Sequence, residues 1–366
     1  MTGLEIPPFE LGSPQSSAET SNGAPVPPLF IVTGPEFGKG PESACNMTCS
    51  YCTPYGEGRN GGNQRLTPDE LNDVLADAYA VGVRTFRFTG GEPTLDLQLG
   101  DKMQKTQELG DDVRLAVTTN GARLRILYPV LKKLLEPRVF VSLDAVDDIE
   151  KTTADKGFSI QKVLTPRLRK TIETRPDNVD LRLNFVLTQF NKDQLPKLVD
   201  YAVEQGISVK IFELLRRGFA FVGDQDPGQV FKDQYTSVNE VLAGLLESYG
   251  EKRDFAGTGG KGIPMQSFNV KGSEIIFFDS NVGAHYGDVC NGCSHYPCQE
   301  GLYGMTFEHG ILFPSGCIND SIYRDLSSAS ESERRNAFTD MIAMVGGATL
   351  SNVVPKWLPI WPKETI

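Results

Sequence analysis

The stretch Cys45-Asn46-Met47-Thr48-Cys49-Ser50-Tyr51-Cys52 places three cysteines in eight residues, with the spacing C-x3-C-x2-C. A [4Fe–4S] cluster normally takes four thiolates, and the next cysteine along the chain is Cys290. One iron of a cluster bound here therefore lacks a protein ligand, and S-adenosylmethionine could chelate it through its amino and carboxylate groups. The competing interpretations are a zinc knuckle or a disulfide pair. Three cysteines complete neither a closed zinc site nor an even disulfide count.

A second motif follows an apolar, strand-like segment. Phe86-Arg87-Phe88-Thr89 runs directly into Gly90-Gly91-Glu92-Pro93. Two glycines at a strand end let the backbone approach a ligand closely, and the Glu92 carboxylate can accept a hydrogen bond from an ammonium group. A Gly-Gly turn alone is common, and it becomes informative because it follows the cysteine motif in this order.

Together, Cys45–Cys52 and Gly90–Pro93 resemble the signature motifs of the radical S-adenosylmethionine (radical SAM) superfamily. The resemblance implies that three cysteines bind the catalytic [4Fe–4S] cluster: Cys45, Cys49 and Cys52. It also implies that five nearby residues contact S-adenosylmethionine: Tyr51, Gly90, Gly91, Glu92 and Pro93. In that superfamily the reduced cluster cleaves S-adenosylmethionine to methionine and a 5′-deoxyadenosyl radical. We therefore expect an external electron donor, such as flavodoxin or ferredoxin, as a partner.

The bulk composition narrows the class of protein. The chain has 366 residues, which can hold one large α/β barrel or two domains. Its 36 basic and 47 acidic residues give a net charge of −11, which argues against nucleic acid or a membrane surface as partner. No segment approaches the roughly 18 to 20 apolar residues of a spanning helix, and no signal-peptide pattern opens the chain, so we expect a cytoplasmic protein. Seven cysteines in two local groups favour metal ligation over disulfides.

Alternating strand-like and helical patterns predict an α/β fold, a partial (β/α)6 TIM-like barrel with a C-terminal auxiliary iron–sulfur cluster region. Parallel strands joined by helices place ligand chemistry at the carboxyl ends of the strands. We expect a disordered leader at 1–27, the radical SAM partial barrel at 28–217, and the auxiliary-cluster (twitch/SPASM-like) region at 218–366.

The predicted strands and helices follow from local patterns. Helices are expected after the capping box Thr67–Glu70 and over Ala122–Leu135, Asp193–Gln205 and Val238–Tyr249. The predicted barrel strands are Leu29–Thr33, Thr85–Thr89, Val113–Thr118, Val139–Leu143, Asp180–Leu187 and Ser208–Leu214. Two hairpins are expected further on, Ser267–Val270 with Glu274–Phe278 and Tyr303–Phe307 with Ile311–Phe313.

Polar residues stand at the ends of three of these strands. Thr119 and Asn120 follow the third strand and Ser142 ends the fourth, with chemistry suited to ribose hydroxyls and a carboxylate. Turn and helix-cap roles are the alternative. Resemblance to the corresponding positions of the superfamily favours cofactor contact. Asn184, within an apolar strand, is either a core amide or a residue near the adenosyl group.

The sixth strand alternates Lys210 on one face with Glu213 on the other, and one face must look into the barrel. We take both residues as candidate catalytic or substrate-binding residues, with a solvated edge charge as the alternative. The pattern narrows the resemblance to the GTP 3′,8-cyclases of molybdenum-cofactor biosynthesis and their relatives.

A second cysteine group lies in the C-terminal region: Cys290, Cys293, Cys298 and Cys317. Four thiolates can complete a second [4Fe–4S] cluster or a zinc site. The resemblance to the cyclases and the SPASM/twitch enzymes favours an auxiliary cluster. The cyclases use three cysteines there, whereas this chain has a fourth candidate, and four available thiolates predict a closed cluster. Near the end of the chain, Gly346-Gly347 resembles the Gly-Gly tail of the cyclases, or else ends a helix.

We therefore predict a radical SAM enzyme, of oxidoreductase or lyase type, that abstracts hydrogen from a small nucleoside-like, sugar-like or peptide substrate. A GTP 3′,8-cyclase is the alternative. Against it, Ser294–Pro297 and Tyr303–Thr306 lack the cyclase arginines, and Lys210 replaces an arginine that would grip phosphate with two donors. A non-catalytic iron–sulfur carrier or zinc scaffold is a third interpretation, which would leave Gly90–Pro93 and Asn120 without a function.

Overall fold

The computed structural model describes most of the barrel and parts of the C-terminal region. The residues it describes are 29–33, 45–47, 49, 51, 67–147, 162–214, 232–249, 253–255, 265–278, 282–285, 304–308, 310–315, 317, 322–347 and 352–355. The predicted leader and four of the predicted ligands lie outside them: Cys52, Cys290, Cys293 and Cys298.

Among the described residues, twelve strands form one sheet in the order β13-β12-β11-β1-β2-β3-β4-β5-β6-β9-β8-β7. Its centre is parallel and comprises β1 (Leu29–Thr33), β2 (Thr85–Thr89), β3 (Arg114–Thr119), β4 (Arg138–Ser142), β5 (Asp180–Leu187) and β6 (Ser208–Glu213). The remaining strands are β7 (Arg253–Phe255), β8 (Met265–Val270), β9 (Ser273–Phe278), β11 (Gly304–Glu308), β12 (Ile311–Ser315) and β13 (Arg324–Asp325). A separate antiparallel pair is formed by β10 (Val282–His285) and β14 (Asn352–Pro355).

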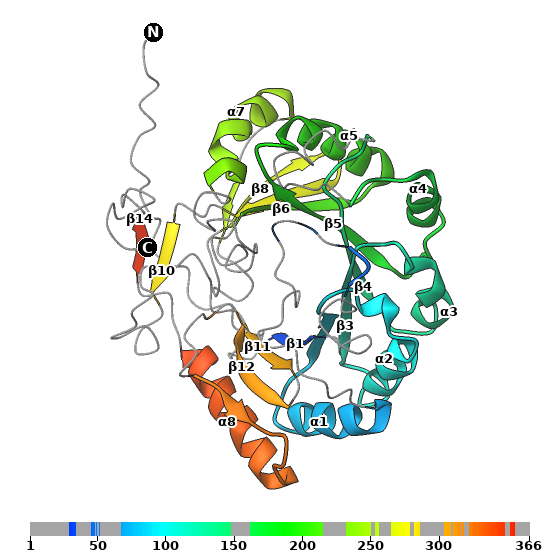
Figure 1. Cartoon of the computed structure of the whole chain (residues 1–366), viewed down its shortest axis with the longest axis vertical. Coiled ribbons are helices and arrows are strands. Elements are labelled where there is room, and N and C mark those ends of the chain that lie inside the picture. The colour runs from blue at the N-terminus through cyan, green and yellow to red at the C-terminus, as the bar shows by residue number, and fades with distance from the viewer. Residues whose placement is uncertain are drawn as a thin grey trace.

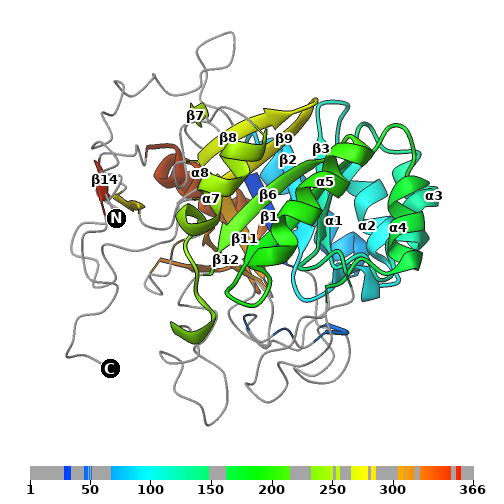
Figure 2. The same ribbon diagram turned by 90° about the horizontal axis from the view of Figure 1, so that it is seen from above.

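Helices follow the parallel strands and cover the outer face of the curved sheet (Figure 1). They are α1 (Pro68–Ala80), α2 (Leu99–Gln107), α3 (Tyr128–Leu131), α4 (Pro166–Glu173) and α5 (Leu195–Gln205). Short 3-10 turns precede three of these helices: η2 (Pro93–Leu95), η3 (Leu124–Leu127) and η5 (Lys192–Gln194). The arrangement is the predicted α/β partial barrel, seen from above in Figure 2. None of the described helices is long and apolar enough to cross a membrane.

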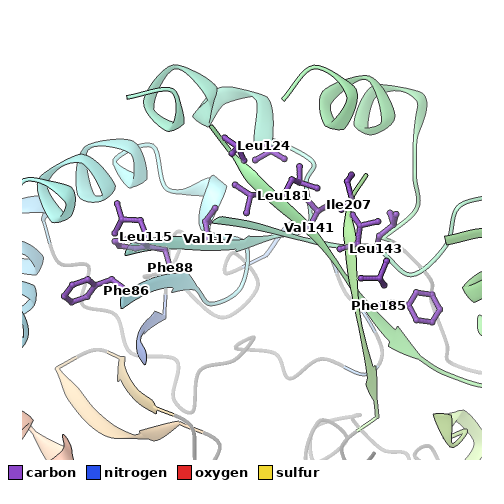
Figure 3. Packing of buried hydrophobic residues seen from close by; sticks show 14 of the residues in the cluster. Phe86, Phe88, Leu115, Val117, Leu124, Val141, Leu143, Leu181, Phe185 and Ile207 are labelled. Atoms are coloured by element: carbon purple, nitrogen blue, oxygen red, sulfur yellow. The ribbon is translucent and has the colours of Figure 1, made fainter. Parts of the chain in front are cut away.

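The hydrophobic core lies between the strands and their covering helices. Successive side chains of a strand point to opposite faces, so alternate residues such as Leu181, Leu183 and Phe185 of β5 face the helices and are buried. Figure 3 shows Leu181 and Val117 between the strands and the helices. Burial of each such side chain contributes roughly 1.5 to 3 kcal/mol. The intervening residues therefore face the other side of the sheet, which we call the inner face.

The first helix begins as predicted. Thr67 caps α1, because its hydroxyl accepts a hydrogen bond from the Glu70 amide (3.3 Å) and the Glu70 carboxylate accepts from the Thr67 amide (2.8 Å). Pro68 occupies the first helical position, where a missing N–H is tolerated. Leu71, Val74 and Leu75 are buried on the face that packs against the sheet.

The predicted continuous helix over Ala122–Leu135 is wrong. The structure has the 3-10 turn η3 followed by the four-residue helix α3, with Pro129 at the start of α3. Proline has no amide hydrogen and its ring collides with the carbonyl four residues earlier, so one regular helix cannot run through this position. The predicted helix from Asp193 likewise begins later, at Leu195, after the turn η5.

The C-terminal region contributes to the same sheet. The two predicted hairpins are β8–β9 and β11–β12, and they extend opposite edges: β9 is parallel to β6 and β11 is parallel to β1. Two helices complete the described part, α7 (Val238–Tyr249), as predicted, and α8 (Glu331–Gly347), which the local patterns did not predict. Gly346 and Gly347 are the last residues of α8.

A buried carboxylate fastens α8 to α1. Asp77 is 3% exposed, and its two oxygens accept hydrogen bonds from the side chains of Arg334 (2.7 Å) and Arg335 (2.9 Å). Because Asp77 belongs to the first crossover helix, this pair of ion pairs connects the start and the end of the described barrel. Both arginines remain partly exposed, so they do not depend on Asp77 alone for their solvation.

We expect Asp77→Ala to lower the free energy of unfolding by about 2 kcal/mol, because it leaves two guanidinium groups at a partly buried contact without their carboxylate. Urea denaturation followed by circular dichroism measures the change. Asp112→Ala is the matched control, since it removes an exposed ion pair with Arg84 and should change stability little. Equal effects of the two substitutions would contradict the fastening role of Asp77.

Candidate functional site

The cysteine motif lies against the carboxyl end of β3. The side-chain amide of Asn120, directly after β3, donates to the Asn46 side-chain oxygen (2.8 Å) and lies 3.9 Å from the Cys45 sulfur. Cys49 is buried and Cys45 is partly buried. The structure thus brings Asn120 and the predicted cluster ligand Cys45 together at the edge of the barrel where the sequence places ligand chemistry.

The Cys45 thiol is in an environment that suits a metal-bound thiolate. Burial raises the pKa of the Cys45 thiol above its usual range, the nearby Glu92 charge raises it further, and a hydrogen bond from the Met47 amide opposes both. The Lys162 charge and the Asn120 amide also lower this pKa, but the net shift is upward, so without bound metal the side chain is a neutral thiol near pH 7. Bound iron would supply positive charge and displace the proton, which fits the predicted [4Fe–4S] cluster.

The Glu92 carboxylate ties the ends of β2 and β3 together. Glu92 is 1% exposed, and its Oε1 accepts hydrogen bonds from the Thr94 amide, the Thr94 hydroxyl and the Thr119 hydroxyl, the last at 2.6 Å. Its Oε2 accepts from the Asn120 amide at 2.6 Å. This geometry gives Glu92 a structural role. Its contact with an ammonium group stays a prediction. Gly90, two residues earlier, has φ 131°, which requires glycine.

Thr119 and Asn120 also make the turn contacts that were the alternative to cofactor binding. The Thr119 hydroxyl accepts from the Gly121 amide (3.0 Å), and the Asn120 side-chain oxygen accepts from the Ala122 amide (3.0 Å). These contacts hold the turn that follows β3. Direct contact of either side chain with S-adenosylmethionine stays a prediction.

Two buried acceptors, one on β5 and one just after β4, have no donor within the described part of the chain. They are Oδ1 of Asn184 on β5 and Oδ1 of Asp144, two residues after the end of β4. Ser142 is paired in register with Asn184, and the Leu143 amide donates to the Asn184 carbonyl at 2.8 Å. Buried acceptors normally have partners, so these atoms suit a ligand that brings hydroxyl or ammonium donors. S-adenosylmethionine carries both, and the residues present fit it.

The inner face of the barrel is basic although the whole chain is acidic. Arg87 Nε donates to the Thr118 hydroxyl (2.8 Å), and its guanidinium lies 5.4 Å from the centre of the Phe140 ring. The Lys210 ammonium lies 5.6 Å from the same ring. Arg182 is paired in register with Phe140. Lys210 was predicted for this face, whereas Arg87 and Arg182 were missed, although each alternates with buried apolar residues in its strand.

These cations act on one another. Burial, which is the largest cause, and the charges of Arg87, Arg182 and Arg138 together lower the pKa of Lys210 to about 8, with Glu274 opposing them. Asp180 compensates part of the charge, since it is bound to Arg138 and Arg182. These neighbouring positive charges repel one another, and an anionic ligand would reduce that repulsion.

Glu213 does not reach the inner face. It stands three positions after Lys210, so it points to the opposite side of β6. Its Oε1 accepts from the Val238 amide (2.5 Å) and from Ser237, and its Oε2 accepts from the Tyr235 hydroxyl (3.0 Å). Glu213 therefore caps the start of α7, where a carboxylate also interacts favourably with the helix dipole.

Cys317 lies at the other end of the barrel from Cys45. It follows β12, which runs antiparallel to β11, and β11 is parallel to β1, so β12 ends at the edge where β1 begins. Cys45, by contrast, lies where β3 ends. No group of three potential metal ligands occurs among the described residues, which include Cys45, Cys49 and Cys317 but none of the other four cysteines.

Comparison with known proteins agrees with this geometry. Residues 43–186 match the Radical SAM superfamily. The GTP 3′,8-cyclase of Hydrogenovibrio crunogenus is 27% identical over 254 residues, which cover 68% of this chain and 73% of that protein. The probable GTP 3′,8-cyclase of Sulfurisphaera tokodaii is 33% identical over 165 residues, covering 44% of this chain and 50% of that protein.

Solved structures show the same fold. Streptococcus suis SuiB bound to S-adenosylmethionine superposes with a TM-score of 0.53 at 15% identity, over 83% of this chain and 65% of SuiB. SuiB bound to its precursor peptide SuiA gives a TM-score of 0.52 at 15% identity, over 86% of this chain and 65% of SuiB. At this identity the likeness concerns the fold alone.

We expect Glu92→Gln to lower the free energy of unfolding of the metal-free protein by about 2 kcal/mol, because the new amide group meets donors where an oxygen accepted hydrogen bonds. Urea denaturation measures the effect. Glu70→Gln, in the exposed capping box of α1, is the control and should have a small effect. A Glu92→Gln protein with unchanged stability would show that Glu92 does not hold the two strand ends together.

Proposed function

We propose that this chain, which carries a radical SAM domain over residues 43–186, abstracts a hydrogen atom from a phosphorylated nucleotide bound on the inner face of its barrel. The observation that carries the proposal is the basic inner face, which lies between the edge with Cys45 and Cys49 and the edge with Cys317. The cofactors of the enzyme are S-adenosylmethionine, its catalytic [4Fe–4S] cluster and an auxiliary [4Fe–4S] cluster.

At the edge with the catalytic cluster, Cys45, Cys49 and Cys52 would hold the iron. When bound, the cluster and S-adenosylmethionine supply a 5′-deoxyadenosyl radical. The protein contributes orientation and exclusion of water. Asn184 offers a buried acceptor to the hydroxyl or amino groups of S-adenosylmethionine, and Ser142 stands beside it in register. At the opposite edge, Cys317 would join Cys290, Cys293 and Cys298 in a closed auxiliary cluster.

The substrate class follows from the charge of the inner face. Arg87 and Lys210 would neutralise the phosphates of a nucleotide, with the charge of Arg182, whose Nε and Nη2 are bound to Asp180, close by. The Phe140 ring, close to Arg87 and Lys210, offers an apolar surface beside these cations. An unphosphorylated nucleoside or sugar would bring no negative charge to these cations. The charge therefore favours a nucleotide over the other substrates that the sequence left open.

GTP is the first candidate. The curated relatives are named GTP 3′,8-cyclases, and a cyclisation of that kind is a lyase-type reaction. Two differences from the cyclase pattern remain part of the proposal: Lys210 stands where an arginine is expected, and Gly304–Thr306 contains no arginine. Both weaken the grip on the triphosphate without removing the basic inner face. Turnover of GTP would place the chain among the cyclases, and turnover of another nucleotide would make it a variant of them.

Anaerobically reconstituted protein should bind about eight irons, and Cys49→Ala about four, because the substitution removes a ligand of the catalytic cluster and leaves the auxiliary one. We expect the variant to lose formation of 5′-deoxyadenosine in the presence of dithionite and GTP. Iron assay and chromatography measure both quantities. With ribose-deuterated GTP, the 5′-deoxyadenosine formed by the unmodified protein should gain deuterium. Undiminished 5′-deoxyadenosine in Cys49→Ala would refute the assignment of the catalytic cluster.

Nucleotide binding should depend on pH through Lys210. Its pKa is about 8 in the free protein, and a bound phosphate raises that pKa because it favours the charged ammonium. Below pH 8 the lysine is already charged and affinity should be constant, while above pH 8 binding must take up a proton. The dissociation constant for GTP should therefore rise by up to about tenfold per pH unit above pH 8, as calorimetry would measure. Lys210→Arg keeps the charge and should remove this dependence. The same slope in both proteins would exclude Lys210 as a phosphate ligand.

A further inference from the structure

Tyr51, which stands between Cys49 and Cys52 in the sequence, is the middle member of a hydrogen-bonded chain. The Lys162 ammonium donates to the Tyr51 hydroxyl oxygen (2.9 Å), and the Tyr51 hydroxyl donates to Asp144 Oδ2 (2.5 Å). The ammonium also lies 5.0 Å from the centre of the Tyr51 ring, within the range of a cation–π interaction. With a cation on one side and a carboxylate on the other, the hydroxyl proton points to Asp144 and the hydroxyl oxygen faces Lys162.

The two residues that hold Tyr51 are themselves fixed in the barrel. The Asp144 amide donates to the Lys162 carbonyl (2.7 Å), and Ala145 forms a parallel bridge with Val163. On the other side, the Asn191 side-chain amide donates to the Asp144 carbonyl (3.1 Å). Asp144 and Lys162 therefore belong to one rigid edge beside the ends of β4 and β5.

This contact is the second of two attachments of the cysteine motif. The first is made by Asn120 at the end of β3 and holds Cys45 and Asn46, at the beginning of the motif. The second is made by Asp144 and Lys162 and holds Tyr51, near the end of the motif. The attachments act on opposite halves of the loop, so each half depends on a different strand end.

The Asp144 side chain is well suited to an anchor. It is 1% exposed, and burial raises the pKa of its carboxyl above the usual range while the Lys162 charge and the Tyr51 hydroxyl act against that rise. A buried carboxylate without partners would be costly, and Lys162, Tyr51 and a backbone hydrogen bond from Val186 reduce that cost. Displacement of Tyr51 would therefore leave the Asp144 carboxylate with fewer hydrogen bonds, and this cost in free energy keeps the loop in position.

We propose that Asp144 and Lys162 are positioning residues for the cofactor site, which hold Tyr51 and the Cys49–Cys52 half of the motif against the end of β4 while S-adenosylmethionine binds. The inference rests on the proposed function, because it requires a cluster on Cys45, Cys49 and Cys52. Neither Asp144 nor Lys162 needs to touch the cluster, since both act through the Tyr51 hydroxyl.

The test uses reconstituted full-length protein carrying Lys162→Met. We expect the dissociation constant for S-adenosylmethionine, measured by calorimetry, to rise about tenfold, because a charge-assisted hydrogen bond that holds the loop is lost. The electron paramagnetic resonance spectrum of the reduced cluster with S-adenosylmethionine should broaden, since the loop takes up several positions. Lys162→Arg keeps a donor and should restore both properties. Lys197→Met, which removes an exposed lysine paired with Asp147, is the matched control and should change neither.

Tyr51→Phe removes only the hydroxyl and should give the same changes as Lys162→Met, and the two substitutions together should be no worse than either alone. Unchanged affinity and an unchanged spectrum in both single variants would overturn the positioning role. A purely structural role would lower the melting temperature of Lys162→Met and leave the affinity and the spectrum as they are, which would also overturn it. Absence of a cluster signal from the unmodified protein would instead refute the proposed function.

Discussion

The two-residue period of the parallel strands is the constraint on which the rest of this structure depends. In β2 and β5, alternate residues enter the core beneath the helices. The residues between them, which include Arg87 and Arg182, point to the inner face. A shift of one residue in strand register would exchange the two sets and bury the arginines among leucines. The hydrophobic burial that selects the register therefore also places the positive charge where an anionic substrate can be bound.

Carboxylates join the ends of the strands to the loops that carry the chemistry. Glu92 accepts hydrogen bonds from donors at the ends of β2 and β3, and Asp144 accepts one from Tyr51 in the cysteine motif. Both side chains are almost completely buried, so each is stable only with its partners in place. Asp144 loses a hydrogen bond when the cysteine loop moves, while Glu92 fixes the strand ends beside the loop, which favours a site formed before the cofactor arrives.

The distribution of charge accounts for a protein that is acidic overall and yet suited to an anion. The net charge of −11 discourages nonspecific contact with polyanions, while Arg87, Arg182 and Lys210 make the inner face locally positive. Cys45 lies where the parallel strands end and Cys317 lies where they begin. A ligand on the inner face would therefore have a cluster at each end of the barrel. The proposed nucleotide chemistry depends on this arrangement as a whole.

The sequence by itself determined the parallel strands of the barrel, the cysteine motif and the strand-end glycines, because period, turn residues and spacing are local properties. The strands Leu29–Thr33 and Asp180–Leu187 and the helix Val238–Tyr249 agree in both bounds with the predictions. The tertiary structure alone decided that Glu213 caps a helix, that the C-terminal hairpins extend the barrel sheet, and that Tyr51 meets Asp144 and Lys162, which are 93 and 111 residues away. Such contacts arise from the packing of distant segments, and no local pattern encodes which buried polar group will satisfy another.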